Sequence, residues 1–204
     1  QQAAERRREQ HATAMYLLTR ELAQATDFAD LLAVVIREVS KAVRADVALS
    51  MPDAGDGGSV TPYFASTWGL NEKEQSVAAW ALRHHQPAGR GTDTLPSAEG
   101  VHLPLLAGEK SVGVLSLRFR NRAALDGNER DLLEAFVRQI ALVIDRQRLR
   151  ETEQRAMMIE ESERLSKTLL NSISHEIRTP IAAISSAASK PATERHQAVE
   201  ELPG

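Results

Sequence analysis

The chain has 204 residues, of which 42 % are hydrophobic and 26 % charged, a composition ordinary for a globular protein with a real core. Its net charge of −3, from 25 basic and 28 acidic residues, argues against a general nucleic-acid binder, which usually carries a strong basic excess. The absence of cysteine excludes disulfides, cysteine-based zinc sites and thioether-linked cofactors. No apolar run reaches the length of about 18 residues that a membrane-spanning helix needs.

The beginning of the chain predicts two helices followed by strands. Residues 3–25 are rich in Ala, Glu, Arg and Leu without Gly or Pro, which favours a helix. Asp27 is placed to cap a second helix from Phe28 to about Val43. Short β-prone runs at 46–51 and 59–67, separated by the turn cluster PDAGDGG, predict two strands.

The middle of the chain predicts a helix, a loop and a hairpin. NEKEQSVAAWALRHH (71–85) favours a helix capped by Asn71, and the Gly- and Pro-containing residues 86–100 favour an irregular loop. VHLPLLA (101–107) and SVGVLSLRF (111–119) predict a β-hairpin with Gly108 in its turn. A helical pattern without Gly or Pro then runs from about Glu129 to Thr179.

This order of elements indicates an α+β fold, with an antiparallel sheet flanked by helices and with long N- and C-terminal helices. We divide the chain into an entry helix (1–26), a sheet-containing domain (27–145), a linker helix (146–164) and the start of a helical domain (165–204). The linker is polar on most faces, apart from Met157, Met158 and Ile159. Such a helix is typical either of a solvated bridge or of narrow pairing with a second copy.

The sequence NSISHEIRTPIAAI (171–184) contains the most distinctive side chain, His175. An apolar stripe follows one side of the predicted helix: Leu165, Leu169, Ile173, Ile177, Ile181 and Ile184. His175 lies about 200° around the helix from Ile173 and from Ile177, so we expect it to face away from this stripe. That position disfavours a buried structural histidine, and the lack of nearby residues at metal-ligand spacing disfavours a metal ligand. The residues alone leave three roles open for His175: structural residue, metal ligand and nucleophile.

The neighbours of His175 suit phosphoryl acceptance. A neutral imidazole is a competent nucleophile, and Glu176 can fix its tautomer or act as its general base. Thr179, one helical turn beyond His175, can position a water for the reverse hydrolysis. Pro180 clashes with the carbonyl of Glu176, so we expect a bend or loosening of the helix that gives another domain room to approach.

SHEIRTPI (174–181) resembles the H-box of sensor histidine kinases, the phosphoacceptor motif of their dimerisation domain. The resemblance implies that His175 is phosphorylated, that Glu176 is its general base and that Thr179 assists phosphatase activity. It further implies a homodimer formed by the linker and phosphoacceptor helices, and a response regulator whose aspartate receives the phosphate. The region 165–204 would then be the N-terminal part of a helical-hairpin phosphoacceptor domain.

The segment from 80 to 108, WALRHHQPAGRGTDTLPSAEGVHLPLLAG, together with VGVLSL and ERDLLEAFVRQIALVIDRQRL, resembles the GAF domain of KdpD-type sensor kinases. The resemblance covers roughly residues 15–190 and implies a relay in a two-component system for potassium uptake. It also implies the cytoplasmic portion of a bacterial inner-membrane protein, joined to the membrane through helices outside this sequence. Arg6, Arg7 and Arg8 would lie just inside that membrane. A solvated helix start explains these arginines equally well.

A histidine kinase needs an ATP-binding domain, and no segment of this sequence resembles one. ATP and Mg are therefore cofactors expected of a full-length kinase and not of this chain. A second dimerisation helix, including Thr193, Glu194, Ala198 and Leu202, has barely begun before the sequence ends at VEELPG. We therefore expect the chain to be a fragment that cannot phosphorylate itself, although a kinase domain supplied in trans could phosphorylate it.

Other candidate sites are weaker. His84, His85 and His102 lack metal-ligand spacing, so we predict structural or loop-anchoring roles and no metal site. A GAF pocket between sheet and loops would be lined by residues 86–97, with Arg90, Thr92 and Asp93 as polar candidates. A pocket filled by the protein's own side chains, acting only as a relay, is the favoured alternative.

Two rival functions come from other classes. The chain could be a ligand-binding and dimerisation GAF module in which the H-box has no phosphotransfer role. It could also belong to a phosphodiesterase or another nucleotide-regulated enzyme with a GAF domain, but no catalytic metal motif supports that reading.

Overall fold

The computed structural model describes residues 2–53, 59–119 and 127–188, apart from a few side chains within its helices. Two compact units follow each other along the chain, Gln1–Arg150 and Glu151–Gly204. Among the described residues, no helix has an apolar stretch long enough to cross a bilayer.

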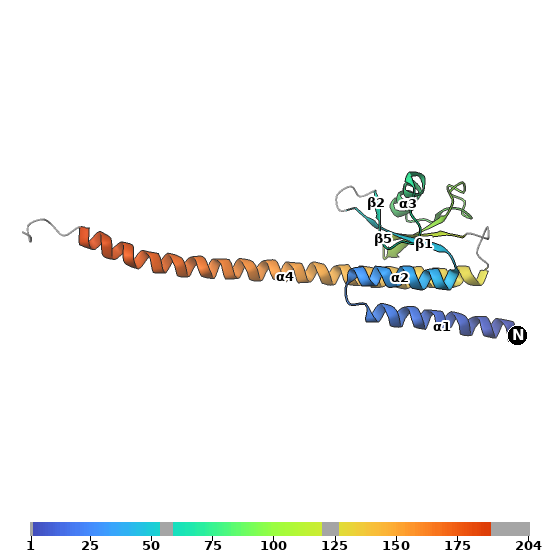
Figure 1. The fold of residues 1–204 in the computed structure, drawn as a ribbon, viewed down its shortest axis with the longest axis horizontal. Coiled ribbons are helices and arrows are strands. Elements are labelled where there is room, and N and C mark those ends of the chain that lie inside the picture. Colours follow the sequence, from blue (N-terminus) through green and yellow to red (C-terminus); the bar gives the residue numbers. More distant parts are fainter. Residues whose placement is uncertain (1, 54–58, 120–126, 189–204) are drawn as a thin grey trace, which may run out of the picture. The chain divides into compact units, whose positions relative to one another are not determined.

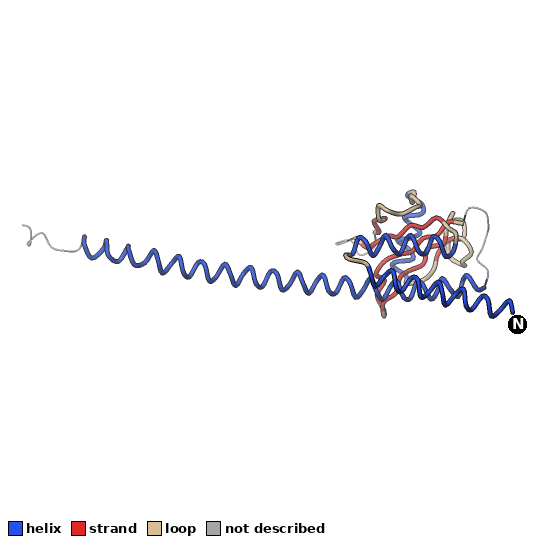
Figure 2. Tube along the Cα trace, turned by 60° about the horizontal axis from the view of Figure 1, so that its bottom comes forward, coloured by secondary structure: helices blue, strands red, loops and turns tan. Residues whose placement is uncertain are grey.

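The first unit contains one antiparallel sheet (Figure 2, red). Its strands are β1 (Asp46–Pro52), β2 (Val60–Pro62), β3 (Ala88–Gly89), β4 (Val101–Ala107) and β5 (Lys110–Arg118), in the order β2-β1-β5-β4-β3. The hairpin β4–β5 turns at Gly108, whose φ of 62° favours glycine. The predicted α+β fold with an antiparallel sheet and flanking helices is confirmed.

Four helices surround or extend this sheet in the described residues: α1 (Gln2–Gln24), α2 (Phe28–Val43), α3 (Glu72–His84) and α4 (Gly127–Ala188). Asp27 caps α2 by accepting a hydrogen bond of 2.8 Å from the Asp30 N–H. Asn71 caps α3 in the same way, at 2.9 Å from the Glu74 N–H. Both predicted helix caps are thus confirmed.

The two faces of the sheet are covered by different helices (Figure 1). One face packs against α2 and the first turns of α4, and this core includes Val35, Leu117, Phe136 and Ile140, all 0–1 % exposed. The other face packs against α3 through Ala48, Val114 and Ala78. Helix α1 packs on α2, burying Leu18 and Leu22. The sheet therefore separates two interiors, each of which could hold a site.

Two secondary-structure predictions need correction. The strand expected at 59–67 is only Val60–Pro62. Ser66 and Thr67 contact β1 through their side chains instead of a regular ladder, since Ser66 Oγ accepts from the Leu49 N–H and Thr67 Oγ1 from the Val47 N–H. The segment predicted as wholly irregular contains the short strand β3, whose Ala88 and Gly89 pair with the edge of β4.

In the second unit the described chain is the continuation of α4 to Ala188. All its described side chains from 152 to 185 are exposed, including the predicted apolar stripe. The helix is uninterrupted at Pro180. The second phosphoacceptor helix that we predicted around Thr193–Leu202 lies outside the described residues.

Candidate functional site

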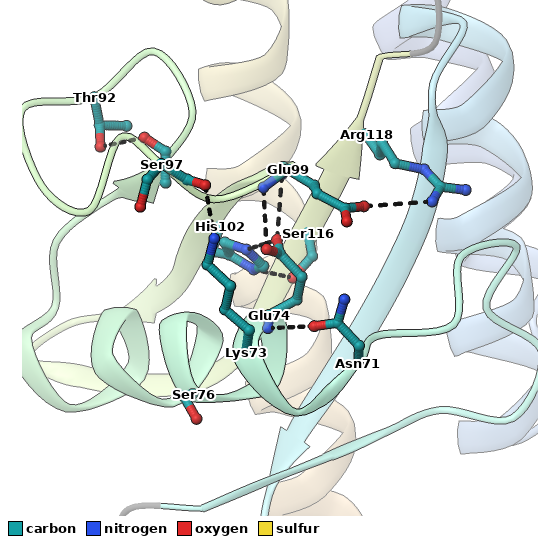
Figure 3. Close-up of polar contacts among 12 residues, drawn as sticks. Asn71, Lys73, Glu74, Ser76, Thr92, Ser97, Glu99, His102, Ser116 and Arg118 are labelled. Carbon is teal, nitrogen blue, oxygen red and sulfur yellow. Dashed lines mark hydrogen bonds and ion pairs between the residues drawn. The ribbon is translucent and has the colours of Figure 1, made fainter.

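A buried polar network lies between α3 and the sheet (Figure 3). His102 on β4 points toward α3, where its Nε2 is 3.0 Å from a carboxylate oxygen of Glu74. Its Nδ1 is 2.8 Å from the hydroxyl of Ser116 on β5. The Glu74 carboxylate also accepts hydrogen bonds from the backbone N–H groups of Glu99 and Gly100, at 3.0 and 3.2 Å. The network therefore ties α3, the sheet and the end of the 86–100 loop together.

The protonation of His102 follows from its surroundings. Burial lowers the pKa of His102 from its usual value, and the hydrogen bond and negative charge of Glu74 offset this only in part. A neutral ring then donates from Nε2 to Glu74 and accepts the Ser116 hydroxyl proton at Nδ1. Although serine, histidine and carboxylate stand in the order of a hydrolytic triad, Ser116 is 0 % exposed, so no substrate reaches its hydroxyl. We conclude that the network is structural.

The interior on the α3 face is filled by the protein's own side chains. Trp68 is 3 % exposed and packs over Gly100, where a Cβ atom would lie only 2.4 Å from the indole ring. Arg118 lies 5.2 Å above the same ring and pairs with Asp46 at 3.0 Å. Position 100 therefore requires glycine, because any side chain there would clash with the ring of Trp68.

A cavity of about 450 Å³ lies instead between β4, the 85–92 loop and the first turns of α4. Arg90 and Thr92, two of the predicted ligand-binding residues, are among its lining residues, whereas Asp93 is exposed and is not. The Thr92 hydroxyl lies 2.8 Å from the carbonyl oxygens of both Gly89 and Thr94, so its donor serves the loop itself. The ligand-binding role of these residues stays a prediction.

The three histidines considered as a cluster each have other partners. His84 stacks on Trp80 with ring centroids 4.1 Å apart, and His85 Nδ1 lies 2.9 Å from the Ser111 hydroxyl. His102 is fully buried in the network with Glu74. Across the described residues, no group of three or more potential ligands could hold a metal ion.

The H-box lies within α4, in the second unit. Glu176 and Thr179 have exposed side chains on this helix, and Pro180 lies inside it. The side chain of His175 is outside the described part of the structure, so its predicted orientation stays a prediction. The stripe residues Ile173 and Ile177 are 50 % and 51 % exposed, so no described part of the chain covers this face.

The basic residues near the N-terminus lie in α1. Arg6 is exposed, and the side chains of Arg7 and Arg8 are outside the described residues. Their predicted contact with lipid headgroups remains untested.

Sequence reasoning missed the Glu74–His102–Ser116 network and the α4 wall of the cavity. Strand alternation places His102 on one face with Pro104 and Leu106, and Ser116 on one face between Val114 and Arg118. A histidine and a serine at such positions in two adjacent apolar strands were an available signal. No sequence signal connected Arg130 and Arg138 with Arg90, because distant segments meet only in the fold.

Comparisons with known proteins agree on one family. A family model described as GAF domain matches residues 27–146. The chain is 31 % identical over 180 residues to the sensor protein KdpD of Escherichia coli K12, covering 88 % of this chain and 20 % of that protein. It is 27 % identical over 188 residues to the sensor protein KdpD of Clostridium acetobutylicum, covering 89 % and 21 %.

A solved structure, the native GAF domain of the potassium sensor histidine kinase KdpD from Escherichia coli, superimposes with a TM-score of 0.60 at 28 % identity. The match covers 72 % of this chain and 99 % of that structure. The chain spans about a fifth of the length of the curated relatives that it matches.

Proposed function

The chain belongs to the GAF-domain family, and from this premise we propose that it is the relay and phosphoacceptor portion of a KdpD-type sensor histidine kinase, with His175 as the phosphorylated residue. One observation carries the proposal: α4 begins inside the GAF domain and continues into SHEIRTPI, in a chain that is similar to KdpD over 88 % of its length. The rival of a GAF module without phosphotransfer leaves that motif unexplained.

The proposed chemistry begins at the imidazole of His175. Its unprotonated ring nitrogen attacks the γ-phosphorus of ATP, the bond to the bridging oxygen breaks, and ADP leaves. Glu176 accepts the hydrogen bond or the proton of the other ring nitrogen. An aspartate of a response regulator then attacks the same phosphorus and the N–P bond breaks. Thr179 positions water for the competing hydrolysis.

Partners complete this proposal. The exposed stripe of α4 would pair with a second copy of the chain, because an apolar helix face that no described part of its own chain covers favours such pairing. ATP and Mg would be bound by a separate kinase domain. The chain would lie on the cytoplasmic side of a bacterial inner membrane, with Arg6, Arg7 and Arg8 near anionic lipid, and would control potassium uptake.

The test uses the catalytic domain of the Escherichia coli relative, supplied in trans with labelled ATP. We expect no label on this chain alone, label when the catalytic domain is added, and transfer of label to the cognate response regulator. His175→Gln should abolish labelling, whereas His84→Gln, a matched change at an exposed histidine, should retain it. Labelling that survives His175→Gln would refute the proposal. Labelling without the added catalytic domain would show that the chain phosphorylates itself, contrary to our expectation.

A further inference from the structure

The cavity beside β4 lies on the opposite side of the sheet from the Glu74–His102 network. Side chains alternate along a strand, and His102 points to α3, so Val101 and Leu103 face the α4 side. Leu133 and Val137 on α4 form the facing wall. The volume of about 450 Å³ falls within the range of small-molecule sites, roughly 300–1,000 Å³.

The floor of the cavity is apolar. It is formed by residues of β4, the residue that follows β5, and α4: Val101, Leu103, Pro104, Leu106, Phe119, Leu133 and Val137. Leu106 remains 39 % exposed, although the neighbouring Leu105 is completely buried. A surface of this kind gains free energy when an apolar or aromatic body displaces water from it.

The rim of the cavity has an unbalanced positive charge. Its two carboxylates already have partners, because Glu134 pairs with Arg138 at 3.8 Å and Glu99 pairs with Arg118 at 3.7 Å. Arg90 and Arg130 line the same rim, and neither has an ion pair within the described part of the chain. A guanidinium recognises carboxylate or phosphate oxygens through two parallel hydrogen bonds.

From this juxtaposition we propose that the cavity binds a small organic anion with an apolar or aromatic body. The body lies on the floor between Leu103 and Val137, and the anionic group meets Arg90 and Arg130. The site differs from the filled interior under α3, and it does not depend on phosphoryl acceptance at His175. Because α4 supplies one wall, occupancy would alter how this helix packs against β4.

Naphthalene carboxylate and its neutral carboxamide are matched probes of similar shape. We expect titration of the full chain, followed by backbone amide NMR, to give saturable shifts confined to residues 85–92, 101–106 and 130–138. The carboxamide should bind roughly tenfold more weakly, the equivalent of losing one charge-assisted contact. Equal affinity for the two probes, absence of saturable binding, or shifts centred elsewhere would overturn the proposal.

Two variants separate charge from shape. The double change Arg90→Glu and Arg130→Glu should weaken binding of the carboxylate probe at least roughly tenfold and leave binding of the carboxamide unchanged. The control Arg155→Glu changes an arginine of α4 that is 78 % exposed, and it should alter the binding of neither probe. Val137→Phe should fill the cavity and abolish binding of both probes. If Val137→Phe does not fold, the charge variants still decide, and carboxylate affinity unaffected by the double change would refute the site.

Discussion

Helix α4 contains two isoleucines in opposite surroundings: Ile140 is 0 % exposed in the first unit, and Ile173 is 50 % exposed in the second. Both belong to regular apolar stripes. At Ile140 the stripe packs into the core with the sheet and α2, whereas no described part of the chain covers Ile173. Helical periodicity therefore identifies an apolar face that needs a partner, but it does not indicate whether that partner lies in the same molecule.

The largest expected effect comes from making the same substitution in both regions. Ile140→Ala should lower the free energy of unfolding of the first unit by about 2–5 kcal/mol, because it leaves a cavity in the core. Ile173→Ala should change it by less than about 0.5 kcal/mol. Urea titration at low protein concentration, followed by the fluorescence of Trp68 and Trp80, which both lie in the first unit, measures both changes. Similar losses of unfolding free energy in the two variants would contradict the contrast between a covered stripe at Ile140 and an uncovered stripe at Ile173.

A second variant tests whether the buried polar network holds the first unit together. Glu74→Ala removes the acceptor for His102 and for two backbone N–H groups, so the free energy of unfolding should fall by about 2–4 kcal/mol. Glu72→Ala, at an exposed glutamate two residues earlier in the same helix, is the control and should cost little. The same urea titration applies, and an effect of Glu74→Ala no larger than that of Glu72→Ala would mean that the network contributes nothing.

The proposed pairing of the exposed stripe with a second copy can be tested without changing the first unit. Leu169→Asp places a charge in the stripe and should raise the dimer dissociation constant at least about 100-fold. Asn171→Asp introduces the same carboxylate about 200° around the helix and should have little effect. Sedimentation equilibrium distinguishes the two variants. A dimer that tolerates Leu169→Asp would place its interface elsewhere.

The smallest effect is the pH dependence of unfolding. The pKa of His102 is lower in the folded protein than its ordinary value of 6.5, so the unfolded state binds the proton more readily. Stability from this group is present above pH 6.5 and is lost as pH falls from there toward the folded pKa, with a slope of at most about 1.4 kcal/mol per pH unit. His102→Gln should flatten the stability profile between neutral and mildly acidic pH. An unchanged slope would show that His102 does not titrate on unfolding.

Local chemistry explains which parts of the fold could be predicted. Asp27 and Asn71 act through backbone groups three residues away, and the hairpin turn acts through Gly108, so short segments were sufficient. The end of β2 was mispredicted because Ser66 and Thr67 bond to β1 through side chains, an arrangement that β propensity does not encode.

The candidate sites also differ in whether their residues are neighbours in the sequence. The H-box is a contiguous motif, so its residues were identified from the sequence although their roles remain predictions. The network and the cavity join residues such as Glu74 with His102, and Arg90 with Arg130, which are brought together only by the sheet topology. Their recognition required the fold.

Localisation of the phosphate shows directly whether His175 is the phosphoacceptor. The chain is incubated with the relative's catalytic domain and ATP, kept at neutral to basic pH to preserve phosphohistidine, and analysed by tandem mass spectrometry. We expect phosphate on His175 and on none of the other five histidines of the sequence. An unmodified His175 beside phosphate elsewhere in the chain, while phosphotransfer to the response regulator continues, would contradict this expectation.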